Sequence, residues 1–358
     1  MSTMGASASV CYNEPMPTFN DSTLLRFAER VLVAVGAPTS HAETVADHLV
    51  GANLAGHDSH GVIRLPQYRA HVREGKIDPA ANPRILKESP TTALLDGNMA
   101  WGQVVAKMAT DLAVERSRKY GTAAIAVRNC YHIGRVGVYA LDAARAGLIA
   151  QIFCNAHGVA RVAPWGGTDA KLATNPIAIA VPRRGEPVLV DITTSVVAEG
   201  KVRVAKLGGN DIPEGWILDS DGKPTTNPAD LYEGGTILPF GGAQGHKGYG
   251  LGVTVDLLGG VVTNAGCGFM TKSFGNGVLF QTVDPAAFDE SDAFLDRVEE
   301  YLEYLMESAT LPGVAEILVP GDPELRVRDA RKESGIELSS GVLEHLEELA
   351  TELGVEGP

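Results

Sequence analysis

Residues 56–68 form the densest group of polar side chains in the chain and read Gly-His-Asp-Ser-His-Gly-Val-Ile-Arg-Leu-Pro-Gln-Tyr. Pro66 suits the first position of a helix, so Arg64 stands just ahead of free N–H groups and a positive dipole end that favour an anion. A guanidinium can grip both oxygens of a carboxylate. We therefore expect a binding site for a small organic acid at Arg64, with Ser59 and His60 beside it.

The same residues also have ordinary interpretations. An Arg before a helix is commonly a solvated or salt-bridged surface residue, and a His in a loop is commonly not catalytic. The density of polar groups favours a site, because binding and catalytic residues collect in loops on a rigid scaffold.

A second acid–base candidate, His132, follows an apolar run at 123–127. The segment 129–134, Asn-Cys-Tyr-His-Ile-Gly, then opens a helical pattern, which places His132 at the C-terminal end of a predicted strand. Ligands bind at that position in open α/β sheets, and an imidazole can take a proton from a hydroxyl and return it. A His that caps the next helix is the alternative. We expect His41, His48, His71 and His345, on predicted helices, to be exposed or capping residues.

Two further stretches could contact a phosphate or ribose. Residues 241–250 hold five glycines around Lys247 and open a helix, which physically resembles a phosphate cradle. Residues 189–195 end a strand in hydroxyls and one carboxylate, which could bind ribose or phosphate or merely cap a helix. Neither the P-loop pattern nor Gly-x-Gly-x-x-Gly occurs, so the ordinary Rossmann fingerprint is missing.

A metal site is the rival interpretation of the first loop, because His57, Asp58 and His60 are close in sequence. Adjacent loop residues rarely converge on one ion, and no His-x-x-x-His or Glu-x-x-His motif supports them. We expect no metal, and keep a metal-dependent hydrolase or lyase as a distant alternative. A catalytically silent binding protein is a third.

Composition and charge narrow the class of protein. The 358 residues can form two or three domains, and no secretory signal or apolar run of membrane-spanning length is visible. Four widely spaced cysteines without Cys-x-x-Cys fit a reducing cytoplasm. Residues 286–358 carry 19 Asp and Glu against 5 Lys and Arg, which speaks against nucleic acid or an anionic membrane as partner.

The elements that must position these residues follow from periodicity. Helices are predicted at 20–36, from a Ser40–Glu43 capping box towards Gly56, and up to Gly75. Beyond residue 83 strands and helices alternate, which predicts an α/β layer structure. The strands are expected at 91–95, 123–127, 148–154, 177–181, 188–192 and 277–283, and the helices at 103–120, 136–146 and 246–264, with a turn-rich excursion at 211–235. Acidic helices follow at 290–308, 324–332 and 340–353.

We accordingly divide the chain into four parts. Residues 1–19 form a leader and 20–88 an N-terminal helical segment that carries the polar loop. Residues 89–285 form the α/β domain, and 286–358 an acidic helical segment that packs on the N-terminal helices.

Taken together, five motifs resemble the type-2 malate/L-lactate dehydrogenases, a family that also holds ureidoglycolate and sulfolactate dehydrogenases, diketogulonate reductase and cyclic-imine carboxylate reductases. The similarity runs in order from about residue 20 to Asp322. The motifs are Asp-Ser-His-Gly-Val-Ile-Arg-Leu-Pro-Gln-Tyr (58–68), His-Ile-Gly-Arg-Val-Gly-Val-Tyr-Ala (132–140), Thr-Asn-Pro-Ile-Ala-Ile-Ala-Val-Pro (174–182), Leu-Val-Asp-Ile-Thr-Thr-Ser (189–195) and His-Lys-Gly-Tyr-Gly-Leu (246–251).

The resemblance implies an enzyme with a non-Rossmann, mixed-sheet α/β domain that binds NAD or NADP, like that of L-sulfolactate dehydrogenase, and a helical domain built from both chain ends. It also implies a homodimer or larger homo-oligomer. By motif, Ser59, Arg64 and Tyr68 match substrate-side positions, and His132 and His60 match the histidines given the proton role in different members. Cofactor-side positions are matched by Asp191, Ile192, Thr193, Ser195, His246, Lys247, Pro320, Gly321 and Asp322.

The expected reaction is hydride transfer between C4 of a nicotinamide and C2 of a small 2-hydroxy or 2-oxo acid of the malate, lactate, ureidoglycolate or sulfolactate type. The alternative is NADPH-dependent reduction of a cyclic imine carboxylate or of diketogulonate. Two departures bear on substrate shape and nicotinamide contacts. Asn-Cys-Tyr-His-Ile-Gly replaces the common Asn-Ser-Asn-His-Phe-Gly, and Ala156 replaces a common hydroxyl residue.

Overall fold

The computed structural model describes residues 16–271 and 273–358, and within them one seven-stranded mixed sheet organises the fold. Its strand order is β2-β3-β4-β11-β5-β6-β7. Only β3 and β4 pair in parallel; every other neighbouring pair in this sheet is antiparallel. The strands are β2 (Arg84–Glu88), β3 (Thr92–Asp96), β4 (Thr122–Cys130), β5 (Ile149–His157), β6 (Ile177–Val181), β7 (Val188–Ile192) and β11 (Gly275–Val283).

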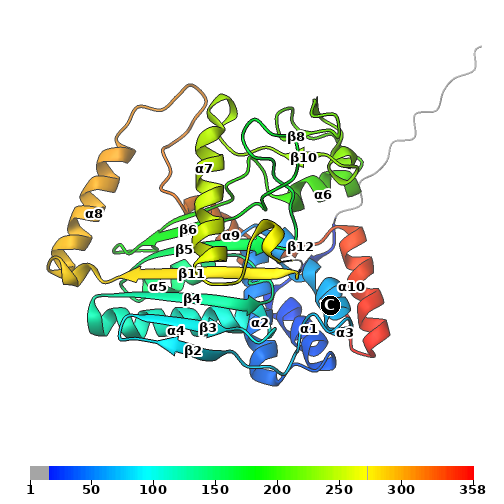
Figure 1. Ribbon diagram of the computed structural model, residues 1–358, viewed down its shortest axis with the longest axis horizontal. Coiled ribbons are helices and arrows are strands. Elements are labelled where there is room, and N and C mark those ends of the chain that lie inside the picture. Colours follow the sequence, from blue (N-terminus) through cyan, green and yellow to red (C-terminus); the bar gives the residue numbers. More distant parts are fainter. Residues whose placement is uncertain (1–15, 272) are drawn as a thin grey trace, which may run out of the picture.

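Helices cover both faces of this sheet (Figure 1). On one face α4 (Gly102–Tyr120) and α5 (Gly137–Arg145) pack against the strands through small residues such as Ala109 and Ala140, which lets the helices approach closely. On the other face α7 (His246–Val255) continues into the π-helix η5 (Asp256–Val261), which lies against β5 and β11.

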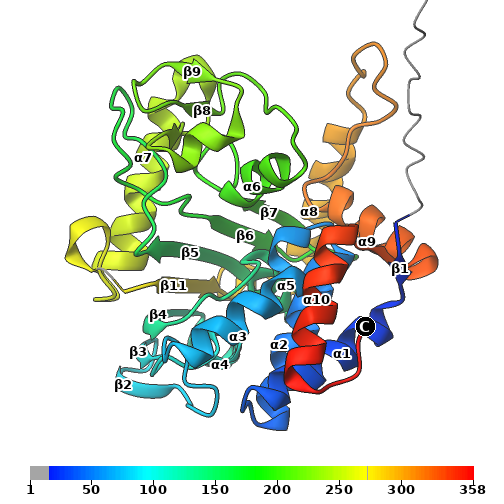
Figure 2. The ribbon, with the colours of Figure 1, turned by 90° about the vertical axis from the view of Figure 1, so that its right-hand side faces the viewer.

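Elements from both ends of the chain build a second, helical layer (Figure 2). α10 contacts α1 and α3, α9 contacts α2, and the short strand β1 (Thr18–Phe19) pairs with β12 (Ile336–Glu337). The α8 helix lies apart from this layer, beyond the opposite end of the sheet. The bounds are α1 (Asp21–Ala34), α2 (Thr39–Leu54), α3 (Leu65–Arg73), α8 (Ser291–Met306), α9 (Asp322–Ser334) and α10 (Ser340–Leu353).

The segment predicted as a turn-rich excursion, 211–235, belongs to a small lobe with its own core. Ile212, Ile217 and Leu231 are buried there beside residues of α6 (Glu199–Leu207). Three two-residue strands complete the lobe: β8 (Ile217–Leu218), β9 (Pro224–Thr225) and β10 (Thr236–Ile237). The core of this lobe was not predictable from the sequence. Its apolar residues are isolated in a polar segment, and neither helical nor strand periodicity links them.

The predicted elements are confirmed at the level of type and approximate position, with three corrections. The Ser40–Glu43 capping box is wrong, because α2 begins at Thr39 after Pro38 and has no side-chain cap. Strand β2 was not predicted, and the helix expected over 246–264 changes at Asp256 from α to π geometry. Of the predicted leader 1–19, residues 1–15 lie outside the described residues, as does Cys11.

No helix in the described part of the chain is both long enough and apolar enough to span a membrane.

Two glycines set the distance between η5 and the sheet, and they give the first testable prediction. A Cβ atom at Gly277 would overlap the carbonyl oxygen of Gly259, so Gly277→Ala should lower the free energy of unfolding by about 1–3 kcal/mol. Gly250→Ala is the matched control, since a Cβ there meets no atom within 4 Å and Ala favours a helix. Urea unfolding of both variants checks the difference. Equal stabilities would contradict the close approach.

Candidate active site

The polar loop of residues 58–64 is held in place by one amide and one ion pair. Asn53 at the end of α2 donates from Nδ2 to Asp58 Oδ1 at 2.7 Å and accepts from the Val62 N–H at 2.9 Å. Arg331 of α9 grips the Asp58 carboxylate at 2.7 and 3.0 Å and also donates to the Asn53 carbonyl. The loop thus folds into two short 3-10 helices, η1 (Asp58–His60) and η2 (Val62–Arg64), with fixed positions.

Arg64 is the residue that immediately precedes α3, as its position before Pro66 predicted. Its Nε donates to the Ser59 carbonyl at 2.6 Å and its Nη1 donates to Gln67 Oε1 at 2.8 Å. These bonds engage only part of the guanidinium's donor set and fix its plane. The loop and the first turn of α3 therefore present an oriented cation that can still bind a carboxylate.

The structure brings both predicted acid–base residues together beside Arg64. The His60 and His132 rings stack with centroids 5.6 Å apart and planes 15° apart, although 72 positions separate them in sequence. Ser59 Oγ lies 3.1 Å from His60 Nδ1. Tyr68 of α3 reaches His132 with its hydroxyl 2.9 Å from Nδ1. All five predicted substrate-side and catalytic residues thus occupy one corner of the molecule.

Tyr68 holds one side of the His132 ring. Its oxygen also accepts a hydrogen bond of 2.8 Å from Gln103 Nε2, a buried side chain at the start of α4. When His132 Nδ1 carries a hydrogen and donates it to this oxygen, Nε2 is left as the proton acceptor. Burial raises the pKa of Tyr68 to about 12, so its phenol stays protonated. The ring is therefore oriented by a neutral partner.

Burial and the neighbouring guanidinium keep both imidazoles uncharged. Desolvation, followed by the charge of Arg64, lowers the pKa of His60 and of His132 well below the usual value. His48 of α2 lies behind them, fully buried, and burial lowers its pKa to about 3. Its Nε2 accepts a hydrogen bond of 2.8 Å from the Arg135 N–H. The sequence-based expectation that His41 and His48 are exposed or capping is wrong, because both are buried.

The small lobe closes over the loop. Helix α6 lies against η1 so closely that a Cβ atom at Gly200 would come within 2.8 Å of the Ser59 Cβ. The same helix carries Arg203, bonded to Glu199 at 2.9 Å, and Glu199 accepts from the Tyr232 hydroxyl at 2.8 Å. The lobe therefore adds a tethered charge pair close enough to Arg64 to influence its ionisation.

A cavity of about 410 Å³ opens between α2, α4, α5, β7 and the start of α9. Arg135 is the most informative residue in its lining, because this guanidinium is only 5% exposed. Its Nε bonds to Asp191 at 3.2 Å, whereas its Nη2 has no hydrogen-bond partner among the described residues. A buried N–H group without a partner is costly, so this nitrogen points to an anionic or polar ligand in the cavity.

Asp191, predicted on the cofactor side, links the sheet to the cavity. Its Oδ2 accepts from the Gly137 N–H at 3.0 Å, at the start of α5, as well as from Arg135. A side chain at Gly137 would collide with this carboxylate. Gly321 lines the same cavity, and the Pro320 carbonyl accepts from the Leu189 N–H of β7 at 2.9 Å. Asp322 closes the turn by accepting from the Val319 N–H.

The remaining predicted cofactor-side residues do not line the cavity. Thr193 and Ser195 bond to backbone carbonyls in the turn after β7, and Ile192 is 44% exposed there. His246 and Lys247 are exposed at the N-terminus of α7, in the part of the molecule occupied by the small lobe. The glycines around them allow close packing, since a Cβ at Gly245 or Gly248 would strike Trp165 or Phe240.

The metal site considered from the sequence would use the carboxylate of Asp58 as its central ligand, but this carboxylate already has other partners in the structure. Asp58 is paired with Arg331 and Asn53, and His57 Nε2 lies 3.7 Å from Glu324. Among residues 16–271 and 273–358 no cluster of three or more His, Cys, Asp or Glu side chains could hold an ion.

Five residues of this site were not identified from the sequence: His48, Asn53, Gln103, Arg135 and Arg331. Four of them act through partners that are distant in sequence, such as Arg331 on Asp58 or Gln103 on Tyr68, whereas Asn53 bonds to Asp58 and Val62 in the loop that follows it. Arg135 belongs to the motif at 132–140. Its positive charge, three residues after His132, was the one feature of the sequence that could have marked it as a site residue.

The lowered pKa values predict a pH-dependent stability. The unfolded chain takes up protons at His48, His60 and His132 near the usual pKa of 6.5, whereas the folded protein does not. The free energy of unfolding should therefore fall as the pH drops below 6.5, by up to about 1.4 kcal/mol per pH unit for each histidine. Urea unfolding at pH 7.5, 6.0 and 5.0 measures this slope. His48→Gln should reduce it and the exposed His345→Gln should not; an unchanged slope in His48→Gln would contradict the assignment.

Known proteins resemble the chain over almost its whole length. The family model described as malate/L-lactate dehydrogenase matches residues 19–347. The malate dehydrogenase of Pyrococcus abyssi is 38% identical, with 93% of this chain and 94% of that protein covered. The sulfolactate dehydrogenase structure from Methanocaldococcus jannaschii aligns with a TM-score of 0.86 at 35% identity, covering 95% of this chain and 98% of that one.

A third similar protein has the same fold but is named as a reductase of a different substrate. The delta1-piperideine-2-carboxylate reductase structure from Pseudomonas syringae pvar. tomato aligns with a TM-score of 0.80 at 29% identity, covering 93% of this chain and all of that one. The family match over most of the chain, with the relatives above, is decisive: this chain belongs to the malate/L-lactate dehydrogenase family of 2-hydroxy-acid oxidoreductases.

Proposed function

We propose that this protein transfers a hydride between C4 of NAD or NADP and C2 of a small 2-hydroxy or 2-oxo acid of the malate, lactate, ureidoglycolate or sulfolactate type. The observation that carries the proposal is the uncharged imidazole pair of His60 and His132, half-buried beside the oriented guanidinium of Arg64. This arrangement combines an anchor for a carboxylate with a base of lowered proton affinity.

Arg64 binds the substrate carboxylate, assisted by the N–H groups at the start of α3. The carboxylate attached to the reacting carbon is thereby fixed next to the histidines. His132 takes the hydroxyl proton at Nε2 during oxidation and returns it during reduction, while Tyr68 holds Nδ1. His60 hydrogen-bonds the reacting oxygen, and Ser59 orients the His60 ring. The small lobe lies against η1 and covers one side of this corner.

The cavity beside Arg135 fits the phosphate-bearing part of a dinucleotide. Arg135 Nη2 supplies a buried, unpartnered donor for an anion, and Gly321 brings backbone close to the cavity. When bound, the nicotinamide supplies or accepts the hydride. Asp191 keeps Arg135 in position and ties it to the N-terminus of α5, so the chain provides orientation and charge.

Reduction of a cyclic imine carboxylate is the second candidate, favoured by the likeness to the reductase named above. The same residues suit it, since Arg64 can hold a carboxylate next to an imine carbon and a protonated His132 can donate to nitrogen. A screen with NADH and NADPH against pyruvate, oxaloacetate, sulfopyruvate, diketogulonate and cyclic imines separates the candidates. Oxidation of ureidoglycolate is assayed alongside.

His132→Ala should lower kcat about 10²–10⁴-fold on the substrate found by this screen, because the general base is lost. Arg64→Lys should mainly raise KM, because an ammonium keeps the charge but not the bidentate grip. His345→Ala on the exposed face of α10 serves as a control for loss of an imidazole. Steady-state kinetics measures all three. Full turnover in His132→Ala would overturn the assignment of the base.

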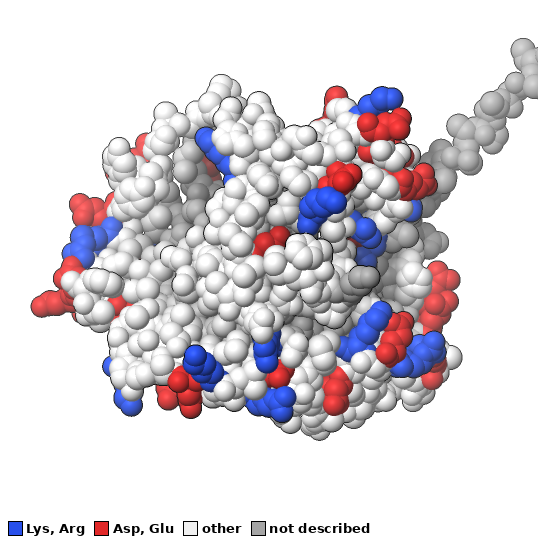
Figure 3. All heavy atoms as spheres, in the orientation of Figure 1, with Lys and Arg blue, Asp and Glu red and all other residues white. Residues whose placement is uncertain are grey.

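The expected homo-oligomer is also part of the proposal. Leu251, Leu257, Val261 and Val262 are between 39% and 60% exposed along α7 and η5. Figure 3 shows few charged side chains over this surface, and an exposed apolar face of this kind suits a second copy of the chain.

Val262→Asp should therefore reduce the molar mass measured by light scattering after gel filtration, because it places a charge in the interface. Val33→Asp is the matched control, since Val33 is 48% exposed on α1, in the helical layer. A monomeric wild-type protein would refute the oligomer.

A further inference from the structure

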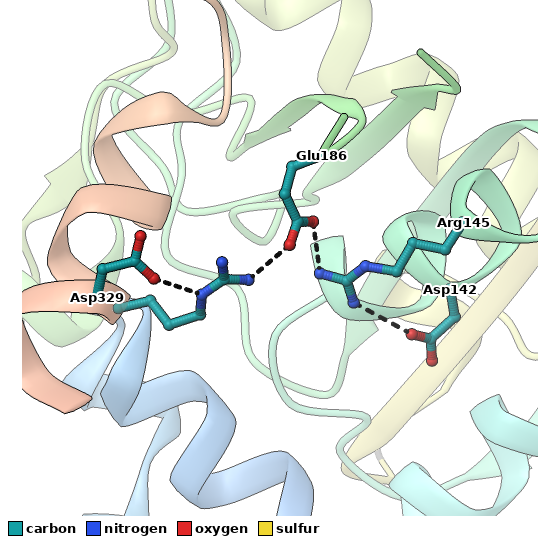
Figure 4. A network of polar contacts seen from close by, with 5 residues as sticks. Asp142, Arg145, Glu186 and Asp329 are labelled. Atoms are coloured by element: carbon teal, nitrogen blue, oxygen red, sulfur yellow. Dashed lines mark hydrogen bonds and ion pairs between the residues drawn. The ribbon is translucent and has the colours of Figure 1, made fainter. Parts of the chain in front are cut away.

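Five charged side chains form an alternating chain (Figure 4), and part of this chain lines the cavity. Arg145 lies 3.8 Å from Asp142 and 2.9 Å from Glu186. Glu186 in turn lies 3.0 Å from Arg328, whose Nε is 3.3 Å from Asp329. The residues come from α5, the β6–β7 turn and α9, so a single carboxylate, that of Glu186, joins the two guanidiniums across the gap between these elements.

Three of these residues, Asp142, Arg145 and Arg328, line the cavity itself. The hydrogen bonds from Arg145 and Arg328 hold the pKa of Glu186 below its usual value even though burial opposes them. The network therefore carries three carboxylates against two guanidiniums. The two arginines of the network, Arg145 and Arg328, are already bound to carboxylates and, unlike Arg135, are not free to receive another anion.

This network lies away from the catalytic corner. His48 and Gln103 line the cavity and contact the residues around His132, whereas Arg145, Pro187 and Arg328 line it where α5, the β6–β7 turn and α9 meet. A dinucleotide with its reacting ring at His132 extends away from that corner, so its adenosine ribose is the part that meets the network. This step rests on the proposed function, which puts the cofactor in the cavity.

We propose that Glu186 makes the site select NAD over NADP. A ribose 2′-hydroxyl can donate to a carboxylate of the network, as acidic residues do in other dinucleotide sites. A 2′-phosphate adds two negative charges and must displace Glu186 from both arginines before it can bind them. The same two arginines would favour the phosphate if Glu186 were neutral.

Binding of cofactor fragments tests this proposal without turnover. Isothermal titration of the full chain with 5′-AMP and with 2′,5′-ADP should give at least about tenfold tighter binding of 5′-AMP, because like charges meet only in the second ligand. Equal or tighter binding of 2′,5′-ADP by the wild-type protein would overturn the proposal, with no variant needed.

Glu186→Gln keeps the shape of the side chain and removes its charge. It should tighten binding of 2′,5′-ADP by about tenfold or more and lower the KM for NADPH relative to NADH. Asp329→Asn is the matched control: it makes the same change in charge beside Arg328, but among the described residues Asp329 pairs only with Arg328, whereas Glu186 bridges Arg145 and Arg328. A similar shift in Asp329→Asn would mean that net charge, and not the position of Glu186, sets the preference, and would also overturn the proposal.

Different results would contradict the cofactor site in the cavity and the role of Glu186. If neither fragment nor intact NADH binds, or if Arg135→Ala leaves binding of 5′-AMP unchanged, the cavity is not the cofactor site and the proposed function fails there. If 5′-AMP binds through Arg135 and the wild-type protein does not discriminate against 2′,5′-ADP, only the role of Glu186 is lost.

Discussion

Two imidazoles and a guanidinium share one half-buried corner of this protein because the imidazoles carry no charge. A protonated His60 or His132 beside Arg64 would place like charges together out of water, which is costly in a low-dielectric environment. The fold therefore stabilises the neutral rings, and the same condition leaves a ring nitrogen able to accept a proton. The stability of this corner and the presence of an unprotonated ring nitrogen have one physical origin.

Residues from every layer of the molecule hold that corner in position. Asn53 and Arg331 fix the loop from the helical layer, Gln103 and Tyr68 fix His132 from α4 and α3, and α6 closes the loop from the small lobe. The sheet contributes Asp191, which connects the end of β7 to Arg135. The groups that we propose to bind substrate and cofactor are thus held in place by hydrogen bonds from rigid elements.

Much of the fold could be predicted from periodicity, because strands such as β6 and helices such as α4 carry continuous local patterns. The loop around Arg64 was also predictable, since Pro66 marks the start of α3. What could not be predicted depends on contacts that only the folded chain makes. Asn53 and Gln103 look like ordinary helix residues until the fold brings Val62 and Tyr68 to them. The core of the small lobe and the unpartnered nitrogen of Arg135 likewise exist only in three dimensions.

Helix α9 carries two of the contacts described above within one turn. Arg328, which lines the cavity, reaches Glu186, and Arg331, three residues later, reaches Asp58 in the polar loop of residues 58–64. Because each residue advances a helix by about 100°, one residue inserted between Gly321 and Arg328 would rotate both guanidiniums off their partners together. The number of residues in this segment therefore fixes the positions of both guanidiniums. Point substitutions on the outer face of α9 are tolerated far more easily than a change in its residue count.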